Sequence, residues 1–288
     1  MKTAIALLLL SAATALAQKP VDVTVQQVND RRTNGSFAQL TLSLQLPKVK
    51  SAEVAASRVL VSSAVDDLGQ SLVDPEQQEP QLETNMRGSM SGEGEKDTPV
   101  NISLTLKNPS RKATKIGQVR GEIELFMPSK DPNSVAEVPK FASFSGKSLT
   151  HKALKANGVE IALVSPAQIE AEKKRIGEAK RKEYKESGWE DGEDLENMIK
   201  SSLEYTLRLE PSDVPVRIKD PNKRIQQIAY VDAKGEVKQV MLRDGEEGIQ
   251  TLSTWGDAPQ PDWKLRVSLK TPKNLVRYPF ALNNVALP

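Results

Sequence analysis

Apolar side chains recur at every second position along much of the chain. The clearest run is Leu40, Leu42, Leu44 and Leu46, where a polar residue separates each leucine from the next, and Pro47 is expected to end it. A period of two places apolar side chains on one face of a β-strand and polar ones on the other. Further strands are predicted at residues 21–25, 59–65, 100–106, 121–126, 159–164, 225–231, 237–242, 265–269 and 276–282. The pattern therefore predicts a mainly β protein.

A helical pattern interrupts the strands near the middle of the chain. Ser165 is a good N-cap residue, Pro166 suits the first helical position, and Gln168 stands at the capping-box position. A charge-dense run follows, and a second apolar stripe at helical spacing covers residues 195–203. The sequence therefore predicts a charged helical insertion over residues 165–203.

The N-terminus has the three parts of a secretory signal. Lys2 is followed by an apolar run over residues 4–10 and by Ala15-Leu16-Ala17, a small-x-small cleavage site. The apolar run is too short for a membrane span, which needs about 20 residues. We therefore expect residues 1–17 to be removed and the mature protein to work in the periplasm, on the cell surface or in the medium. No other stretch of the sequence is apolar enough to predict a transmembrane segment.

These patterns divide the mature chain into three parts. We expect an N-terminal β-sandwich domain at residues 18–164, the helical insertion at 165–203, and a C-terminal β-sandwich domain at 204–288. Within the first domain, residues 74–99 are rich in proline, glycine and acids and are expected to form a long polar loop.

The two strand-rich parts resemble each other. Arg58–Gly69 aligns without gaps on Arg224–Gly235, and both segments are expected to be a strand that ends in a D-x-x-G turn. Further along, Leu104–Pro109 matches Val267–Pro272. Two matched blocks in the same order indicate an internal duplication, although a shared β-architecture could also produce some of this similarity. Short strands in two copies suggest tandem immunoglobulin-like (Ig-like) sandwiches.

These motifs, together with the closing segment Val276–Pro288, resemble exported bacterial proteins of uncharacterised function that carry Ig-like β-sandwich modules. The resemblance covers about half of the mature chain. It implies the fold and an address outside the cytoplasm, and it implies no catalytic residue. The chain has no cysteine, so its fold must be stable without disulfides. An exported chain of this size without cysteine fits a bacterial envelope protein better than an animal secreted protein.

Overall charge predicts no polyanionic partner. The chain has 40 Lys and Arg against 38 Asp and Glu, so there is no global attraction to nucleic acid. Charge is uneven within the helical insertion, whose first part is basic and whose second part is acidic. Lys180 and Arg181 are therefore candidate binding residues for a partner, and the alternative is a solvated helix that pairs with its acidic neighbour.

The sequence contains no recognisable catalytic set. Its only histidine, His151, is expected on a surface strand that leads into a tight hairpin turn at Asn157-Gly158. With one histidine and no cysteine, a zinc site would need several carboxylates. We therefore predict that the protein is not an enzyme and that it needs no cofactor.

Three aspartates in the two D-x-x-G turns are candidate calcium ligands: Asp66, Asp67 and Asp232. Asp and Gly are equally the residues that a strand-ending turn requires, because the carboxylate binds backbone N–H groups and glycine accepts positive φ. Both interpretations stay open at this stage, with no other metal site predicted.

Trp255 and Trp263 bracket a proline-rich loop and could stack on a sugar ring. More often, a tryptophan beside a sandwich strand is part of the core. The sequence thus favours a non-catalytic binding, adhesion or scaffold module whose partner is a protein or glycan of the cell envelope. The alternative is a carbohydrate-active protein or other hydrolase that uses carboxylates near the two tryptophans.

Overall fold

The structure is a computed structural model that describes residues 22–33, 38–74, 80–84, 98–206, 209–245, 248–254 and 258–288. The expected signal peptide, residues 1–17, lies outside the described residues, as does most of the long polar loop. The described chain is mainly β, with antiparallel sheets and few helices, as the alternating pattern predicts.

The strands are β1 (Thr24–Arg31), β2 (Gln39–Lys50), β3 (Ala56–Asp66), β4 (Glu83–Thr84), β5 (Pro99–Leu106), β6 (Lys115–Phe126), β7 (Val135–Pro139), β8 (Glu160–Leu163), β9 (Val214–Lys219), β10 (Ile225–Val231), β11 (Val237–Gln239), β12 (Met241–Asp244), β13 (Gln250–Ser253), β14 (Lys264–Leu269) and β15 (Leu275–Ala286). The α-helices are α2 (Lys152–Ala156), α3 (Pro166–Glu186) and α4 (Glu193–Thr206). Short 3-10 turns cover Ser51–Glu53, Pro128–Lys130 and Phe141–Phe144.

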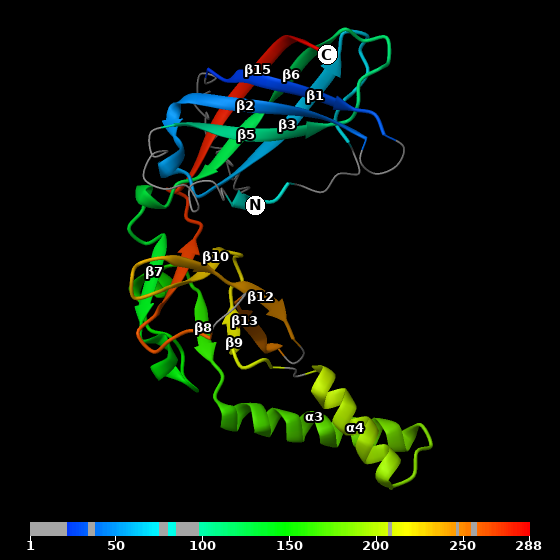
Figure 1. Cartoon of the computed structure of the whole chain (residues 1–288), viewed down its shortest axis with the longest axis vertical. Coiled ribbons are helices and arrows are strands. Elements are labelled where there is room, and N and C mark those ends of the chain that lie inside the picture. Colours follow the sequence, from blue (N-terminus) through cyan, green and yellow to red (C-terminus); the bar gives the residue numbers. More distant parts are fainter. Residues whose placement is uncertain are drawn as a thin grey trace, which may run out of the picture.

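Two sheets pack face to face in the upper part of Figure 1, and we call them the first sheet pair. One sheet has the order β1-β2-β5 and the other β15-β6-β3-β4. The four alternating leucines of β2, from Leu40 to Leu46, are almost fully buried between them. Contrary to expectation, β2 continues past Pro47 to Lys50. Its register with β5 shifts after Leu46, because proline cannot donate to the ladder and is accommodated in the irregular stretch.

A second sheet pair follows the same plan. The order β7-β14-β10-β11 faces the order β8-β9-β13-β12, and one apolar core lies between these sheets. Tyr230 of β10 is fully buried there and stacks on Phe141, with ring centroids 5.2 Å apart. The order β15-β6-β3-β4 thus matches β7-β14-β10-β11, with β3 and β10 in equivalent places. The three-stranded sheet β1-β2-β5 matches β8-β9-β13, and β12 is an additional edge strand.

Two crossovers join the sheet pairs. β6 of the first pair continues into β7 of the second, and β14 of the second continues into β15 of the first. Phe126 pairs with Leu275 on one side of the junction, and Val135 pairs with Ser268 on the other. The result is a two-stranded antiparallel ribbon, residues 115–139 with 264–286, that runs through both sheet pairs. We call this ribbon the spine.

The crossovers are bonded to each other inside the protein. The Met127 backbone N–H donates to the carbonyl oxygen of Asn274 at 2.8 Å, and the Leu269 N–H donates to that of Ser134 at 2.7 Å. The Asn274 side chain is fully buried and donates to the Leu269 carbonyl at 2.8 Å, while its oxygen accepts from the Thr271 N–H at 2.8 Å. The junction is thus a packed, hydrogen-bonded structure.

This pairing does not follow the boundaries expected at residues 164 and 204. β7 and β8, expected in the N-terminal domain, pair with β14 and β9, whereas β15, expected in the C-terminal domain, pairs with β6. The alternating pattern of a strand shows which of its faces is buried. It does not show which distant strand lies beside it.

The two matched blocks of the expected repeat differ in how they lie in the sheets. The first block, Arg58–Gly69 and Arg224–Gly235, occupies equivalent strands, β3 and β10, and equivalent turns. The second block places β5 beside β2 but β14 beside β10, so these two strands are not equivalent. By position in the sheets, the counterpart of β14 is β6.

α3 and α4 stand between β8 and β9, which pair with each other. We call α3, α4 and their connection, residues 166–206, the helical arm. The arm extends from the end of the second sheet pair that faces away from the first (Figure 1). Within the part of the chain that the structure describes, no helix is long and apolar enough to cross a bilayer.

Candidate functional site

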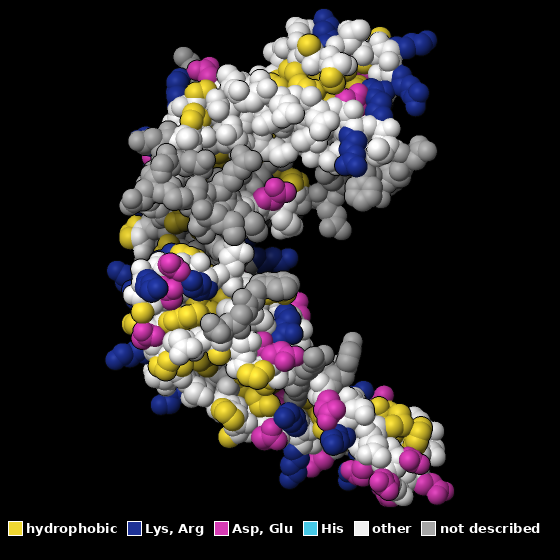
Figure 2. Space-filling model, in the orientation of Figure 1, with side chains coloured by type: hydrophobic (Ala, Val, Ile, Leu, Met, Phe, Trp, Pro, Cys, Tyr) yellow, Lys and Arg dark blue, Asp and Glu magenta, His cyan; other side chains and the backbone are white. Residues whose placement is uncertain are grey.

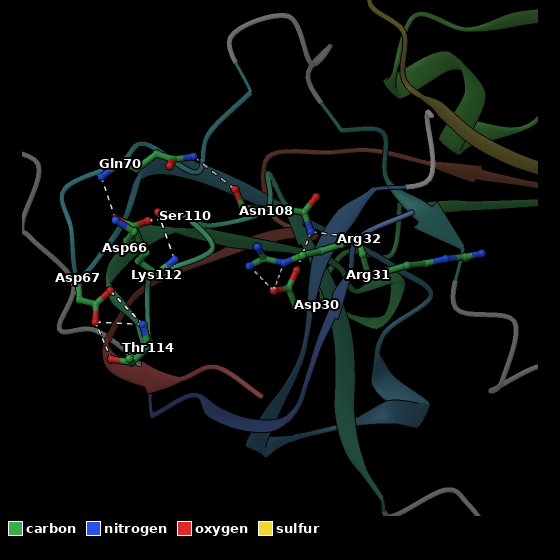
Figure 3. A network of polar contacts seen from close by, with 10 residues as sticks. All are labelled: Asp30, Arg31, Arg32, Asp66, Asp67, Gln70, Asn108, Ser110, Lys112 and Thr114. Carbon is green, nitrogen blue, oxygen red and sulfur yellow. Dashed lines mark hydrogen bonds and ion pairs between the residues drawn. The ribbon is translucent and has the colours of Figure 1, made fainter. Parts of the chain in front are cut away.

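Polar side chains gather where β3 ends and β6 begins (Figure 3). The opposite ends of these two strands, where Ala56 pairs with Phe126, adjoin the second sheet pair, so the gathered side chains lie at the end that faces away from it. β1, β3 and β5 all end here and β6 begins here, so their loops lie together. We call this the loop end. It contains two of the three candidate calcium ligands, Asp66 and Asp67.

The Asp66 carboxylate holds two loops together. One oxygen accepts the backbone N–H groups of Leu68 at 3.0 Å and Gln70 at 2.8 Å, and the other accepts the Ser110 N–H at 3.0 Å. Asp66 is only 2% exposed, so these bonds take the place of water. Gly69 has a φ of 83°, the left-handed conformation that the turn requires.

Asp67 and Asp30 are also bound by protein donors. The Thr114 hydroxyl donates to Asp67 at 2.7 Å and holds the pKa of this carboxyl below its usual value. Burial raises the pKa of Asp30, but bonds from Arg32 and the Asn108 amide outweigh it, and the net pKa is lowered. All of these aspartates therefore act within the loop network as hydrogen-bond acceptors.

The turn after β10 has the same geometry. One oxygen of Asp232 accepts the backbone N–H groups of Lys234 and Glu236, each at 2.9 Å. Gly235 has a φ of 86° and its N–H donates to the Asp232 carbonyl at 3.0 Å. The two D-x-x-G sequences thus form one turn twice, in which Leu68 of the first copy corresponds to Lys234 of the second.

Protein donors account for the three aspartates, because Asp66 and Asp232 bind N–H groups of their own turns and Asp67 binds Thr114 of the neighbouring loop. Their oxygens point at N–H and hydroxyl donors, whereas a calcium site needs several oxygens directed at one centre. Among the described residues, no group of three or more His, Asp and Glu side chains is placed to hold a metal ion.

The two candidate tryptophans have different outcomes. Trp263 is half-buried, belongs to the edge of the second core and lies 6.1 Å from the Tyr230 ring at an angle of 52°. Trp255 lies outside the described residues. Trp263 is therefore a core contact.

His151 does not lie on a strand. Its Nδ1 accepts the Ala153 backbone N–H at 3.1 Å and so caps α2, a short helix at Lys152–Ala156. The expected hairpin turn is wrong for the same reason, because Asn157 and Gly158 end this helix and only Gly158 has positive φ. An Asn-Gly pair suits a helix C-terminus as well as a hairpin.

Lys180 and Arg181 lie on α3, where both are ion-paired. Lys180 binds Glu183 at 3.2 Å, and Arg181 donates to both carboxylate oxygens of Glu196 on α4 at 2.6 Å. The charge asymmetry of the arm is thus used partly to join its two helices.

Beside these ion pairs, an open groove of about 1130 Å³ lies between the two helices. Its apolar floor is formed by Gly177, Ile199, Leu203 and Leu209. Its charged lining residues include Lys174, Glu178 and Lys200.

Trp189, at the far end of the arm, is 43% exposed. Sequence reasoning missed Trp189, although Gly188 before it and a tryptophan in so charged a segment were visible signals.

A buried polar cluster in the second sheet pair was also missed. Asp213 accepts from the Ser253 hydroxyl at 2.7 Å, from the Glu210 backbone N–H at 2.7 Å and from Arg243. Burial, with the nearby Asp213 charge, raises the pKa of Tyr230, whose buried hydroxyl has no hydrogen-bond partner among the described residues. These residues are far apart in the sequence and form no motif.

Comparison with known protein families, curated proteins and solved structures finds no match to this chain.

Proposed function

We propose that the protein is an exported, non-catalytic binding or scaffold module of the bacterial cell envelope, built from two Ig-like sandwiches and a helical arm that docks a partner. The repeated sheet order supports the Ig-like interpretation, because β15-β6-β3-β4 over β1-β2-β5 recurs as β7-β14-β10-β11 over β8-β9-β13, with β12 as an additional edge strand. The export signal at residues 1–17 supports the location.

The groove between α3 and α4 is the observation that carries the docking function. A groove with an apolar floor and a charged rim is the form in which helical pairs accept an amphipathic helix from a partner. The base of the arm packs against the second sheet pair through the cluster of Val164, Ile169, Ile176 and Ile249. The rest of the arm extends beyond both sheet pairs, so a partner can approach it (Figure 1). Trp189 adds an exposed residue of a type that often dominates binding energy.

Gly177 lies at the floor of the groove and leaves it without a side chain there. A glycine inside a helix costs about 1 kcal/mol relative to alanine, so its presence at the middle of α3 needs a reason. A Cβ at this position would meet Leu203 and Ile199 at 3.5 and 3.6 Å, which is ordinary contact. Alanine therefore fits without displacing a neighbour, whereas a larger side chain would fill the floor of the groove.

This difference gives a matched test. The mature protein, Gly177→Ala and Gly177→Leu are compared for capture of envelope proteins, after circular dichroism has shown equal helix content. We expect the same partner with the first two proteins and about a tenfold loss with Gly177→Leu, because overfilling a packed contact typically costs about 1–3 kcal/mol. Equal capture by all three proteins, or capture of nothing, would contradict docking in the groove.

A further inference from the structure

The loop end carries an exposed apolar residue that its fold does not require. Leu68 stands at the tip of the Asp66 turn and is 58% exposed, more than any other large apolar side chain that the structure describes. The equivalent turn after β10 has Lys234 at this place and makes the same bonds to its aspartate. Because a polar side chain serves the turn equally well, the exposed leucine is not explained by stability.

Basic side chains surround this turn. Arg111, Lys112 and Lys115 come from the loop before β6 and from its first residue, and all three are exposed. This loop is fixed against the Leu68 turn, since the Asp67 N–H donates to the Lys115 carbonyl at 3.1 Å and the Ser110 N–H binds Asp66. Arg111 and Lys112 form no ion pair with a described residue, and Lys115 lies near Asp67.

The outward charge of the loop end is positive although the whole chain is nearly neutral. Its cations are Arg31, Arg32, Lys107, Arg111, Lys112 and Lys115, and its acids are Asp30, Asp66, Asp67 and Asp74. Asp66 is buried, and the Asp30 side chain is only 10% exposed and binds Arg32 at 2.6 Å, so Arg32 and Asp30 offset each other. Lys107 binds Asp74 at 3.2 Å. Figure 2 shows Lys and Arg side chains gathered around this end of the molecule.

We propose that the loop end binds the surface of an anionic lipid bilayer. Leu68 enters the interfacial region, while Arg111, Lys112 and Lys115 face the lipid phosphates. Basic residues near an anionic leaflet are attracted to it, and an apolar side chain between them adds a contact that a soluble polyanion cannot provide. The inference does not rest on the docking groove, which lies at the opposite end of the molecule.

The structure also gives this binding a consequence. The Leu68 turn is fixed by three backbone hydrogen bonds to Asp66, so the leucine is presented without a cost of ordering the loop. The spine runs from this end toward the second sheet pair and the arm (Figure 1). A protein attached by its loop end therefore holds the groove away from the bilayer.

The test is sedimentation of the mature protein with vesicles of phosphatidylcholine alone and of phosphatidylcholine with phosphatidylglycerol. We expect binding only to the anionic vesicles, weakened by salt. Leu68→Ser should reduce the partition several-fold, and Arg111→Ala with Lys112→Ala should reduce it by tenfold or more, at about fivefold for each cation. Lys234→Ser, which changes the equivalent turn of the second sheet pair, is the matched control and should bind like the wild type.

Three results would overturn the proposal. The first is no binding to anionic vesicles, and the second is equal binding by wild type, Leu68→Ser and the double variant. The third is binding of soluble polyphosphate that depends on the two cations, together with vesicle binding that does not depend on Leu68; this would identify a polyanion site instead. Folding of each variant is checked by its melting temperature, so that loss of structure is not mistaken for loss of contact.

Discussion

At the scale of single residues, Asp66 and Asp232 make a natural comparison, because they form the same turn in different surroundings. Both accept two backbone N–H groups within their own turn. Only Asp66 also binds a second loop, through Ser110, and only Asp66 is fully buried. Asp232 instead has Lys238 at 3.3 Å on a more open surface.

We therefore expect Asp66→Ala to lower the free energy of unfolding by about 2–3 kcal/mol, and Asp232→Ala by about 1 kcal/mol. The difference arises because the Ser110 N–H loses its acceptor at a partly buried position, whereas water can replace the more exposed Asp232 carboxylate. Urea denaturation of both variants measures the two losses of unfolding free energy. The slopes of free energy against urea concentration are checked for equality between the variants. Equal losses would mean that the bond between the loops adds nothing.

At the scale of elements, the sequence predicts α3 well because its N-terminus is specified locally. The Ser165 hydroxyl accepts the Gln168 N–H at 3.2 Å, and the Gln168 side chain accepts the Ser165 N–H at 2.9 Å, which is the capping box expected from these residues. Strands with strict alternation, such as β2, were predictable for the same reason. The region of His151 was not, because Asn157-Gly158 serves a helix end and a hairpin alike.

Ser165→Ala tests whether the arm is a separate unit of stability. Loss of an N-cap costs about 1 kcal/mol, and the arm has only a small core that includes Ile169 and Ile176. We expect faster amide exchange throughout α3, with exchange in β3 and β10 unchanged. Ser187→Ala at the other end of α3, where the hydroxyl merely donates to the Glu183 carbonyl, is the control and should alter exchange little. Faster exchange in the strands would show that the arm and the sheets unfold together.

At the scale of the whole molecule, the two sheet pairs could be predicted only in part. Period two revealed most strands, but β7 was missed because it is short and ends at Pro139, and β9 because Pro215 interrupts its pattern. The exchange of β7 and β15 between the sheet pairs depends on pairings more than a hundred residues apart, which no local pattern encodes. Site residues were also predictable only in part. The D-x-x-G aspartates could be recognised in the sequence, whereas the exposure of Leu68 could not.

The spine predicts that both sheet pairs unfold in one cooperative transition. Unfolding of the second sheet pair frees both crossovers, and with them the chain that leads into β15, whose Phe280 and Leu282 are buried in the first core. We therefore expect the calorimetric and van 't Hoff enthalpies to agree, and amides of β3 and β10 to share one exchange free energy.

Asn274→Ala, which removes buried hydrogen bonds where the crossovers meet, should lower that shared exchange free energy by about 2–3 kcal/mol. Asn283→Ala is the control in the same ribbon, because its bond with Gln118 is exposed and its loss should change stability by less than about 0.5 kcal/mol. Two separate transitions, or destabilisation of only one sheet pair by Asn274→Ala, would show that the ribbon joins the sheet pairs without coupling their folding.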